Sequence, residues 1–202
     1  MWLPFFIFGW YATSQLRSNM NIRLHYNAPV ILTFSLLCVV VFAANIAAGG
    51  ALTPMVSLGG KFNLSNWVDY LTLFTHCLGH ANVEHLLGNL TFILLLGPVL
   101  EEKYGWRQLL IMILLTALIT GLLNALIFHD GLWGASGIVF MLVMLISFVN
   151  VQAGKIPITF ILILLLFVGK EIYNSFQADN ISQFAHIIGG LCGSMFGFMG
   201  KR

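Results

Sequence analysis

Three polar motifs interrupt an otherwise apolar chain. Ser136 lies in a GASG sequence, His186 lies in AHIIGG, and Asn89 closes the stretch HANVEHLLGN. A serine hydroxyl is a weak nucleophile until a base takes its proton, and a neutral imidazole is the usual base near neutral pH. Ser136 and His186 therefore indicate acyl-transfer chemistry, provided that the fold brings the two side chains together.

Acyl transfer also requires hydrogen-bond donors for the oxyanion that develops on the substrate carbonyl. His85 and Asn89 are spaced i, i+4, so they share one face of a helix, and an imidazole N–H and a carboxamide can both donate. The backbone N–H of Ser136, at a helix start, is a third candidate donor. Gly134 permits a tight turn and the close approach of a substrate backbone.

A carboxylate that would orient the histidine is missing where it would be expected. Asp130 and Asp179 belong to loops, and Glu84 stands at the mouth of a helix. We therefore expect a Ser–His dyad rather than a Ser–His–Asp triad.

The composition places these residues in a membrane. Of 202 residues, 59% are apolar and only 8% are charged, whereas a soluble domain is about 25% charged. The formal net charge of +2 gives no indication of a nucleic-acid partner. Because a spanning helix needs about 20 mostly apolar residues, we expect one membrane domain over residues 28–200, preceded by an interfacial or cytoplasmic segment, 1–27. The six expected spans are Ala28–Ala48, Val83–Leu100, Trp106–Phe128, Ser136–Val151, Ile156–Tyr173 and Ile181–Gly200.

The basic residues predict the orientation of these spans, because Lys and Arg are enriched in cytoplasmic loops. Seven of them fall on one side, and only Lys61 and Lys170 fall on the other. Both termini are therefore expected in the cytoplasm. The seven are Arg17, Arg23, Lys103, Arg107, Lys155, Lys201 and Arg202.

This orientation puts the polar motifs at one level, near the outer face of the membrane. The second, fourth and sixth spans all start outside, and Asn89, Ser136 and His186 lie close to those starts. The fourth span is short, about 24 Å of helix against a hydrocarbon core of about 30 Å. The loop before Ser136 must then dip inward, which is tolerated only beside water or inside protein. We expect a polar cavity that opens outward.

Glycines recur every four residues along the sixth span, at Gly189, Gly193 and Gly197. Such a stripe lets a second helix approach backbone to backbone. His186 lies three residues before Gly189, on nearly the same face. If the fourth span is the neighbour, His186 faces its Ser136 end.

Together these motifs resemble the rhomboid intramembrane serine proteases. The matching patterns are G-x-S-G, A-H-x-x-G-x-x-x-G and H-x4-H-x3-N, and their order and the six-span layout match the basic prokaryotic form. The resemblance implies an all-α, six-transmembrane-helix bundle in the bacterial cytoplasmic membrane that cleaves single-span transmembrane substrates near the outer face. It makes Ser136 the nucleophile, His186 the general base, and His85, Asn89 and the Ser136 N–H the oxyanion hole.

The resemblance also assigns the first loop and the fifth span. The loop 50–81 would form a membrane-embedded hairpin, and the fifth span would be the lateral gate. The sequence departs from the family's pattern at two places. The first loop lacks the Trp-Arg pair of many bacterial members, which concerns the rigidity of that loop. Phe140 stands where many have a tyrosine against the catalytic histidine, which keeps the ring packing but concerns the fine positioning of His186.

Two other functions fit some of these features. A catalytically inactive rhomboid-like protein would bind transmembrane helices without cutting them, but such relatives typically lack the serine or the histidine. A small transporter would use the polar cavity, but it would place charges or broken helices near the midplane, often within an inverted repeat.

Three histidines of the first loop and the second span could suggest a metal site. His76, His80 and His85 do not share one helical face, however, and no cysteine or carboxylate completes a ligand set. We expect no metal and no cofactor.

Overall fold

The computed structural model describes residues 25–59, 62–128, 131–148 and 183–200, together with five separate residues between 158 and 166. Within these ranges the regular structure is helical, and a single antiparallel bridge, Leu58 to Leu132, is the only extended pairing there. The expected all-α class is confirmed. Most of the expected fifth span, Ile156–Tyr173, lies outside the described residues, as do residues 1–24.

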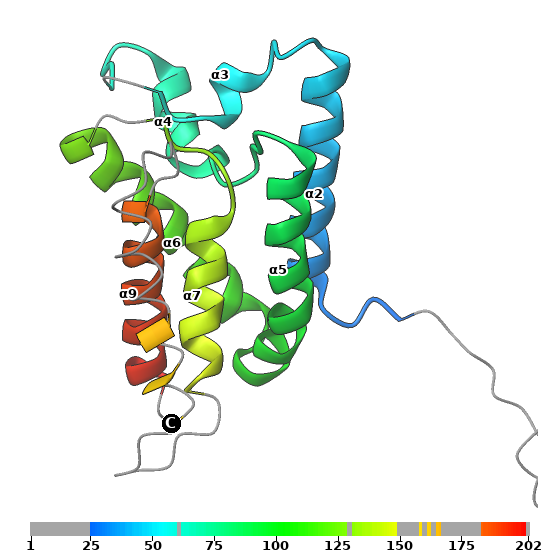
Figure 1. The fold of residues 1–202 in the computed structure, drawn as a ribbon, viewed down its shortest axis with the longest axis vertical. Helices are drawn as coiled ribbons and strands as arrows, with labels where there is room; N and C mark the ends of the chain where they lie inside the picture. Colours follow the sequence, from blue (N-terminus) through cyan, green and yellow to red (C-terminus); the bar gives the residue numbers. More distant parts are fainter. Residues whose placement is uncertain are drawn as a thin grey trace, which may run out of the picture.

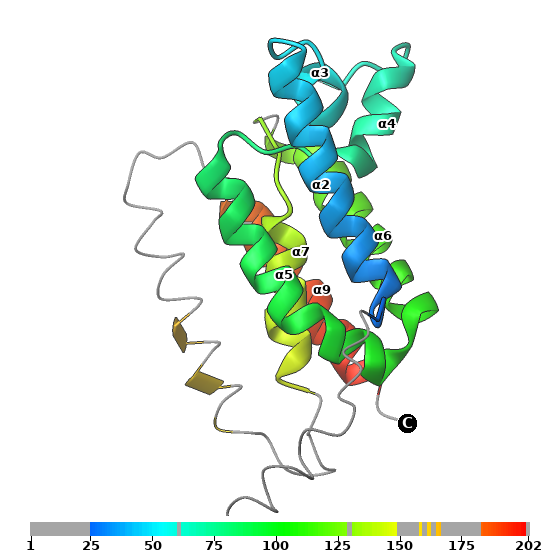
Figure 2. The ribbon, with the colours of Figure 1, turned by 90° about the vertical axis from the view of Figure 1, so that its right-hand side faces the viewer.

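The long helices form a bundle, and two short helices lie at one of its ends, in the connection from α2 to α5 (Figures 1 and 2). Helices α5, α7 and α9 all begin at that end of the bundle. The starts of these three helices therefore lie on one level. The long elements are α2 (Pro29–Ala47), α5 (Val83–Tyr104), α6 (Trp106–Leu123) with the π-helical turn η1 (Asn124–Phe128), α7 (Ser136–Ile146) and α9 (Gln183–Met199), and the short ones are α3 (Thr53–Val56) and α4 (Trp67–Thr75).

Three of the described helices are long and apolar enough to cross a membrane. They are Pro29–Ala47, Val83–Tyr104 and Trp106–Ile127. Helices α7 and α9 are also apolar but shorter, at 11 and 17 residues. The five helices coincide with five of the six expected spans. The fourth expected span was too long, because α7 ends at Ile146 and not at Val151. The six-span count stays a prediction.

A buried carboxylate joins the first two long helices. Glu101 of α5 is only 5% exposed, and its two oxygens accept hydrogen bonds of 3.0 Å from the backbone N–H groups of Val30 and Ile31. These are unpaired donors of the first turn of α2, whose first residue, Pro29, has no N–H. The negative charge also suits the positive end of the helix dipole. Glu101 thus caps α2 from a neighbouring helix.

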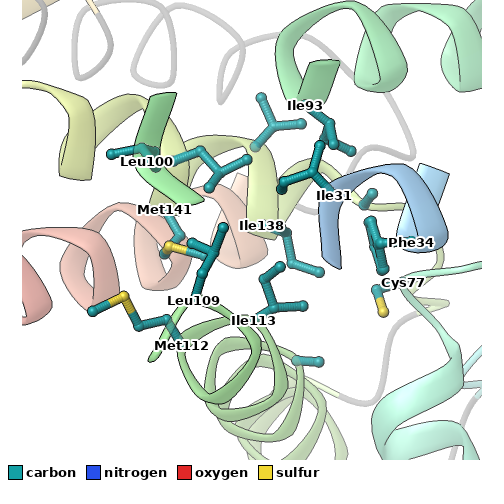
Figure 3. Close-up of a cluster of buried hydrophobic side chains, with 14 of the residues drawn as sticks. Ile31, Phe34, Cys77, Ile93, Leu100, Leu109, Met112, Ile113, Ile138 and Met141 are labelled. Atoms are coloured by element: carbon teal, nitrogen blue, oxygen red, sulfur yellow. The ribbon is translucent and has the colours of Figure 1, made fainter. Parts of the chain in front are cut away.

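Apolar side chains of four helices fill the centre of the bundle (Figure 3). Ile31 comes from α2, Ile93 from α5, Leu109 from α6 and Met141 from α7, and all four are fully buried. This packing holds α7, which begins with Ser136, against the other helices. The packing of the bundle core therefore determines where Ser136 lies along the bundle.

Helix α4 has one buried and one exposed apolar face. The exposed side chains are spaced for a single helical stripe, at Trp67, Tyr70, Leu71 and Phe74. Large aromatic and aliphatic side chains in this arrangement are typical of a helix that lies in the membrane interface. Its start is capped by Asn66, whose side chain accepts from the N–H of Val68 at 3.2 Å.

We expect Glu101→Ala to lower the free energy of unfolding by about 2–3 kcal/mol, because two buried N–H groups of α2 lose their acceptor. The matched control is Glu102→Ala, which removes the same charge from the exposed neighbouring position. Equilibrium unfolding in mixed micelles measures both variants. Equal stability of the two would show that the cap contributes nothing.

Candidate active site

The loop before Ser136 is held at two points by the connection between α2 and α5. Leu132 exchanges two backbone hydrogen bonds of 2.8 Å with Leu58, and the N–H of Gly134 donates to the carbonyl of His76 at 2.9 Å. Gly134 adopts φ +117°, a conformation that side chains disfavour. Ser136 follows as the first residue of α7 and is partly exposed. These contacts therefore define the position of Ser136 at the start of α7.

Helices α7 and α9 cross with their backbones in contact. A Cβ at Gly189 would overlap the carbonyl of Gly137, and one at Gly193 would overlap the carbonyl of Met141. In the other direction, a Cβ at Gly137 would lie 3.2 Å from the carbonyl oxygen of Ala185. The predicted packing role of the glycine stripe is confirmed, and the helix that approaches it is the one that begins with Ser136.

This crossing brings His186 over the start of α7. The imidazole is 8% exposed and packs on the ring of Phe140, with ring centroids 4.5 Å apart and planes at 42°. Phe140 is four residues after Ser136, so the two share a face of α7. Gly137 and Ala185, whose backbones approach each other, are the direct neighbours of Ser136 and His186 in the chain. Ser136 and His186 are thus each next in the chain to a residue of this backbone contact between α7 and α9.

The two α5 residues lie beside the same loop. The Asn82 side chain caps α5 by accepting from the N–H of His85 at 2.8 Å. The His85 ring lies against Gly134, where a Cβ would be 2.8 Å from its Nε2 atom. Asn89, one turn later, is buried with 6% exposure. A glycine at position 134 is needed both for the backbone conformation and for the space that the imidazole occupies.

No catalytic role was predicted for His80, yet it lies beside Asn89 and His85. Its Nε2 atom is 3.0 Å from Nδ2 of Asn89, and its Nδ1 atom is 3.2 Å from the carbonyl oxygen of Leu78. Its ring also packs edge to face on that of His85, at 5.1 Å between centroids. Burial, with a smaller effect of the charge on His85, lowers the pKa of His80 to about 4. The pattern H-x4-H-x3-N contains this residue and could have drawn attention to it.

His76 is a second buried histidine of this region. Its Nε2 atom is 3.1 Å from the carbonyl oxygen of Ala117 in α6, and burial lowers the pKa of His76 to about 4. The described residues contain no group of three or more His, Cys, Asp or Glu side chains that could hold a metal ion. His76 and His80 are therefore neutral hydrogen-bonding groups at physiological pH.

A comparison with protein families agrees with this geometry. A family model described as Rhomboid domain matches residues 68–202. The matched region begins in α4 and contains all the residues that meet at the start of α7.

We expect Gly189→Ala to lower the free energy of unfolding by about 1–3 kcal/mol, because its methyl group would force α9 away from the Gly137 carbonyl. Gly88→Ala is the matched control, since that glycine is also helical but has nothing within 4 Å of an added Cβ. The control should be neutral or stabilising by up to about 1 kcal/mol. Unfolding in mixed micelles distinguishes the two. A Gly189→Ala variant as stable as the control would rule out a tight crossing.

Proposed function

The chain belongs to the rhomboid family and is an integral membrane protein, and on this premise we propose that it is an intramembrane serine endopeptidase with a Ser136–His186 dyad. One observation carries the proposal. The His186 ring packs on Phe140, one helical turn beyond Ser136, at the point where the backbones of Gly137 and Ala185 approach each other.

In the first half of the reaction His186 accepts the proton of the Ser136 hydroxyl while Oγ attacks the scissile carbonyl carbon. The tetrahedral intermediate collapses as the C–N bond breaks, and His186 gives the proton to the leaving amine. Water then attacks the acyl-enzyme with His186 again as base, which releases the acid product and restores the serine. Packing on Phe140 supports the orientation of an imidazole that no carboxylate would hold.

Three donors are available for the oxyanion. The N–H of Ser136 belongs to the first turn of α7, where a helix offers no internal acceptor and its dipole is positive. His85 approaches this turn through its contact with Gly134. Asn89 lies on the same face of α5, one turn further along. Removing one such donor typically costs about 10²–10³ in kcat.

The substrates are single-span transmembrane proteins, cut near the outer face of a bacterial cytoplasmic membrane. This part of the proposal depends on the charge pattern, which places both termini in the cytoplasm. It is supported by the length of α7, whose 11 residues span about 16 Å. If the far end of this short helix reaches the inner boundary of the hydrocarbon core, Ser136 lies below the membrane surface, in the polar cavity that the proposed hydrolysis requires. The exposed apolar stripe of α4 suits the membrane-embedded hairpin expected for the first loop.

Two observations favour a protease over the two alternative functions. An inactive relative that binds transmembrane helices would need neither a nucleophile nor a base, whereas this chain has both Ser136 and His186, and the His186 ring packs on Phe140, one turn beyond Ser136. A transporter would concentrate its polar groups near the midplane. The candidate site residues instead gather at one end of the bundle, where α5, α7 and α9 begin (Figure 1).

We expect Ser136→Ala and His186→Ala each to reduce cleavage of a model transmembrane substrate by at least about a thousandfold, because neither half of the dyad acts alone. Ser147→Ala, at the other end of α7, serves as the control and should keep wild-type turnover. A fluorophosphonate probe should label the wild type and the control but not Ser136→Ala. Wild-type turnover by Ser136→Ala would disprove the assignment.

We expect Gly134→Ala to lower cleavage at least tenfold, because the methyl group would meet the His85 ring in a backbone conformation that alanine disfavours. Gly131→Ala lies three residues earlier in the same loop, with open space around the added Cβ, and should cleave at the wild-type rate. The measurement is kcat/KM in proteoliposomes. Equal rates for the two variants would exclude a role for Gly134 in the site.

A further inference from the structure

We propose that His80 is a positioning residue that orients the Asn89 carboxamide so that one of its N–H groups points to the oxyanion. This inference rests on the proposed function, because Asn89 matters only if an oxyanion forms. It starts from a chain of two hydrogen bonds, of which the one to Asn89 is buried and the one to Leu78 is partly buried. His80 is 3% exposed, and its two ring nitrogens contact Asn89 and the Leu78 carbonyl.

The partners of His80 determine where its proton lies. A carbonyl oxygen can only accept, so the Nδ1 atom of His80 carries the proton and donates to Leu78 at 3.2 Å. An amide nitrogen can only donate, so Nε2 accepts from Nδ2 of Asn89 at 3.0 Å. One neutral tautomer satisfies both contacts. The low pKa of His80, about 4, keeps the ring neutral at physiological pH, and the two partners select the tautomer.

This tautomer selects one of the two orientations of the carboxamide. If the Asn89 group were rotated by half a turn, its oxygen would face the lone pair of Nε2, and two acceptors would meet in a buried site. His80 therefore keeps the amino side of Asn89 in its present direction. Because that amino group has two N–H bonds and His80 accepts one, the second remains for the substrate oxygen.

His80 also supports the other side-chain donor. Its ring packs edge to face on the His85 ring, which in turn lies against Gly134. Both α5 residues of the oxyanion hole thus contact a single imidazole. We expect the hydrogen bond to Asn89 to dominate over the ring contact with His85, so replacement of His80 should disturb mainly the orientation of Asn89 without removing either donor.

The backbone around His80 is firmly anchored. The residue follows a turn in which the N–H of Leu78 donates to Thr75 at 2.9 Å, and Gly79 packs so closely on the Val56 carbonyl that a Cβ could not fit. The same turn holds the nucleophile loop, because the carbonyl of His76 accepts the N–H of Gly134. Residues 76–80 therefore connect the loop that carries the nucleophile to the residue that stabilises the oxyanion.

The test is a double-mutant cycle of His80 and Asn89 in the full-length chain, with kcat and KM measured on a model transmembrane substrate in proteoliposomes. We expect His80→Ala to lower kcat about 10- to 100-fold while KM changes less than about twofold, because only transition-state binding is lost. In the Asn89→Ala background the same change should lower kcat less than about twofold. The control His25→Ala, an exposed histidine, should behave as the wild type.

Two further variants separate hydrogen bonding from ring packing. His80→Gln retains an acceptor for Asn89, so its kcat should be at least about tenfold higher than that of His80→Ala. His80→Phe retains the ring that packs on His85 but not the acceptor, so it should remain as slow as alanine. Recovery by phenylalanine and not by glutamine would overturn the positioning role, as would equal effects of His80→Ala in both backgrounds.

The outcome also distinguishes this inference from the proposed function. If the wild type neither cleaves the substrate nor is labelled at Ser136, the protease assignment itself fails. If the wild type cleaves and every His80 variant cleaves equally well, only the role of His80 fails. Unfolding of each variant in mixed micelles accompanies the kinetics, and a loss of kcat in a variant as stable as the wild type supports positioning.

Discussion

The direct contact between the backbones of α7 and α9 is the constraint on which the rest of the site depends. In lipid no hydrophobic effect drives helices together, so association relies on close van der Waals packing and interhelical hydrogen bonds. Gly189 and Gly193 permit that packing, because their hydrogen atoms leave room for the carbonyls of Gly137 and Met141. A larger residue at either glycine would separate the helices and move His186 away from the start of α7.

The connection between α2 and α5 provides a second constraint, and it acts on the loop instead of the helices. The bridge between Leu58 and Leu132 and the bond from Gly134 to His76 hold the segment that leads into Ser136. A buried backbone must satisfy its polar groups, and these bonds do so where no helix continues. The segment that leads into Ser136 is thereby held by backbone hydrogen bonds to two other points of the chain.

Three of the buried polar side chains in the described residues join separate elements. Glu101 joins α5 to the start of α2, His76 joins its loop to α6, and His80 joins the same loop to Asn89. Each such bond is expensive to break in a low-dielectric interior, so each also specifies one arrangement of its elements. The polar contacts define the relative positions that apolar packing alone would leave adjustable.

The sequence by itself determined the membrane class of this protein and the residues for which a chemical role is proposed. The features that can be read from the sequence are local patterns: apolar runs of spanning length, the motifs around Ser136, His186 and Asn89, and the glycine stripe. In a helix, residues three or four positions apart lie on one face, so such spacing predicts which residues share a face. It could not determine the partner of that stripe, the early end of α7 or the position of His80. These depend on contacts between residues far apart in the chain, and such contacts exist only once the helices pack. Tertiary structure alone decided that the imidazole of His186 rests on Phe140 and that a single histidine, His80, contacts both His85 and Asn89.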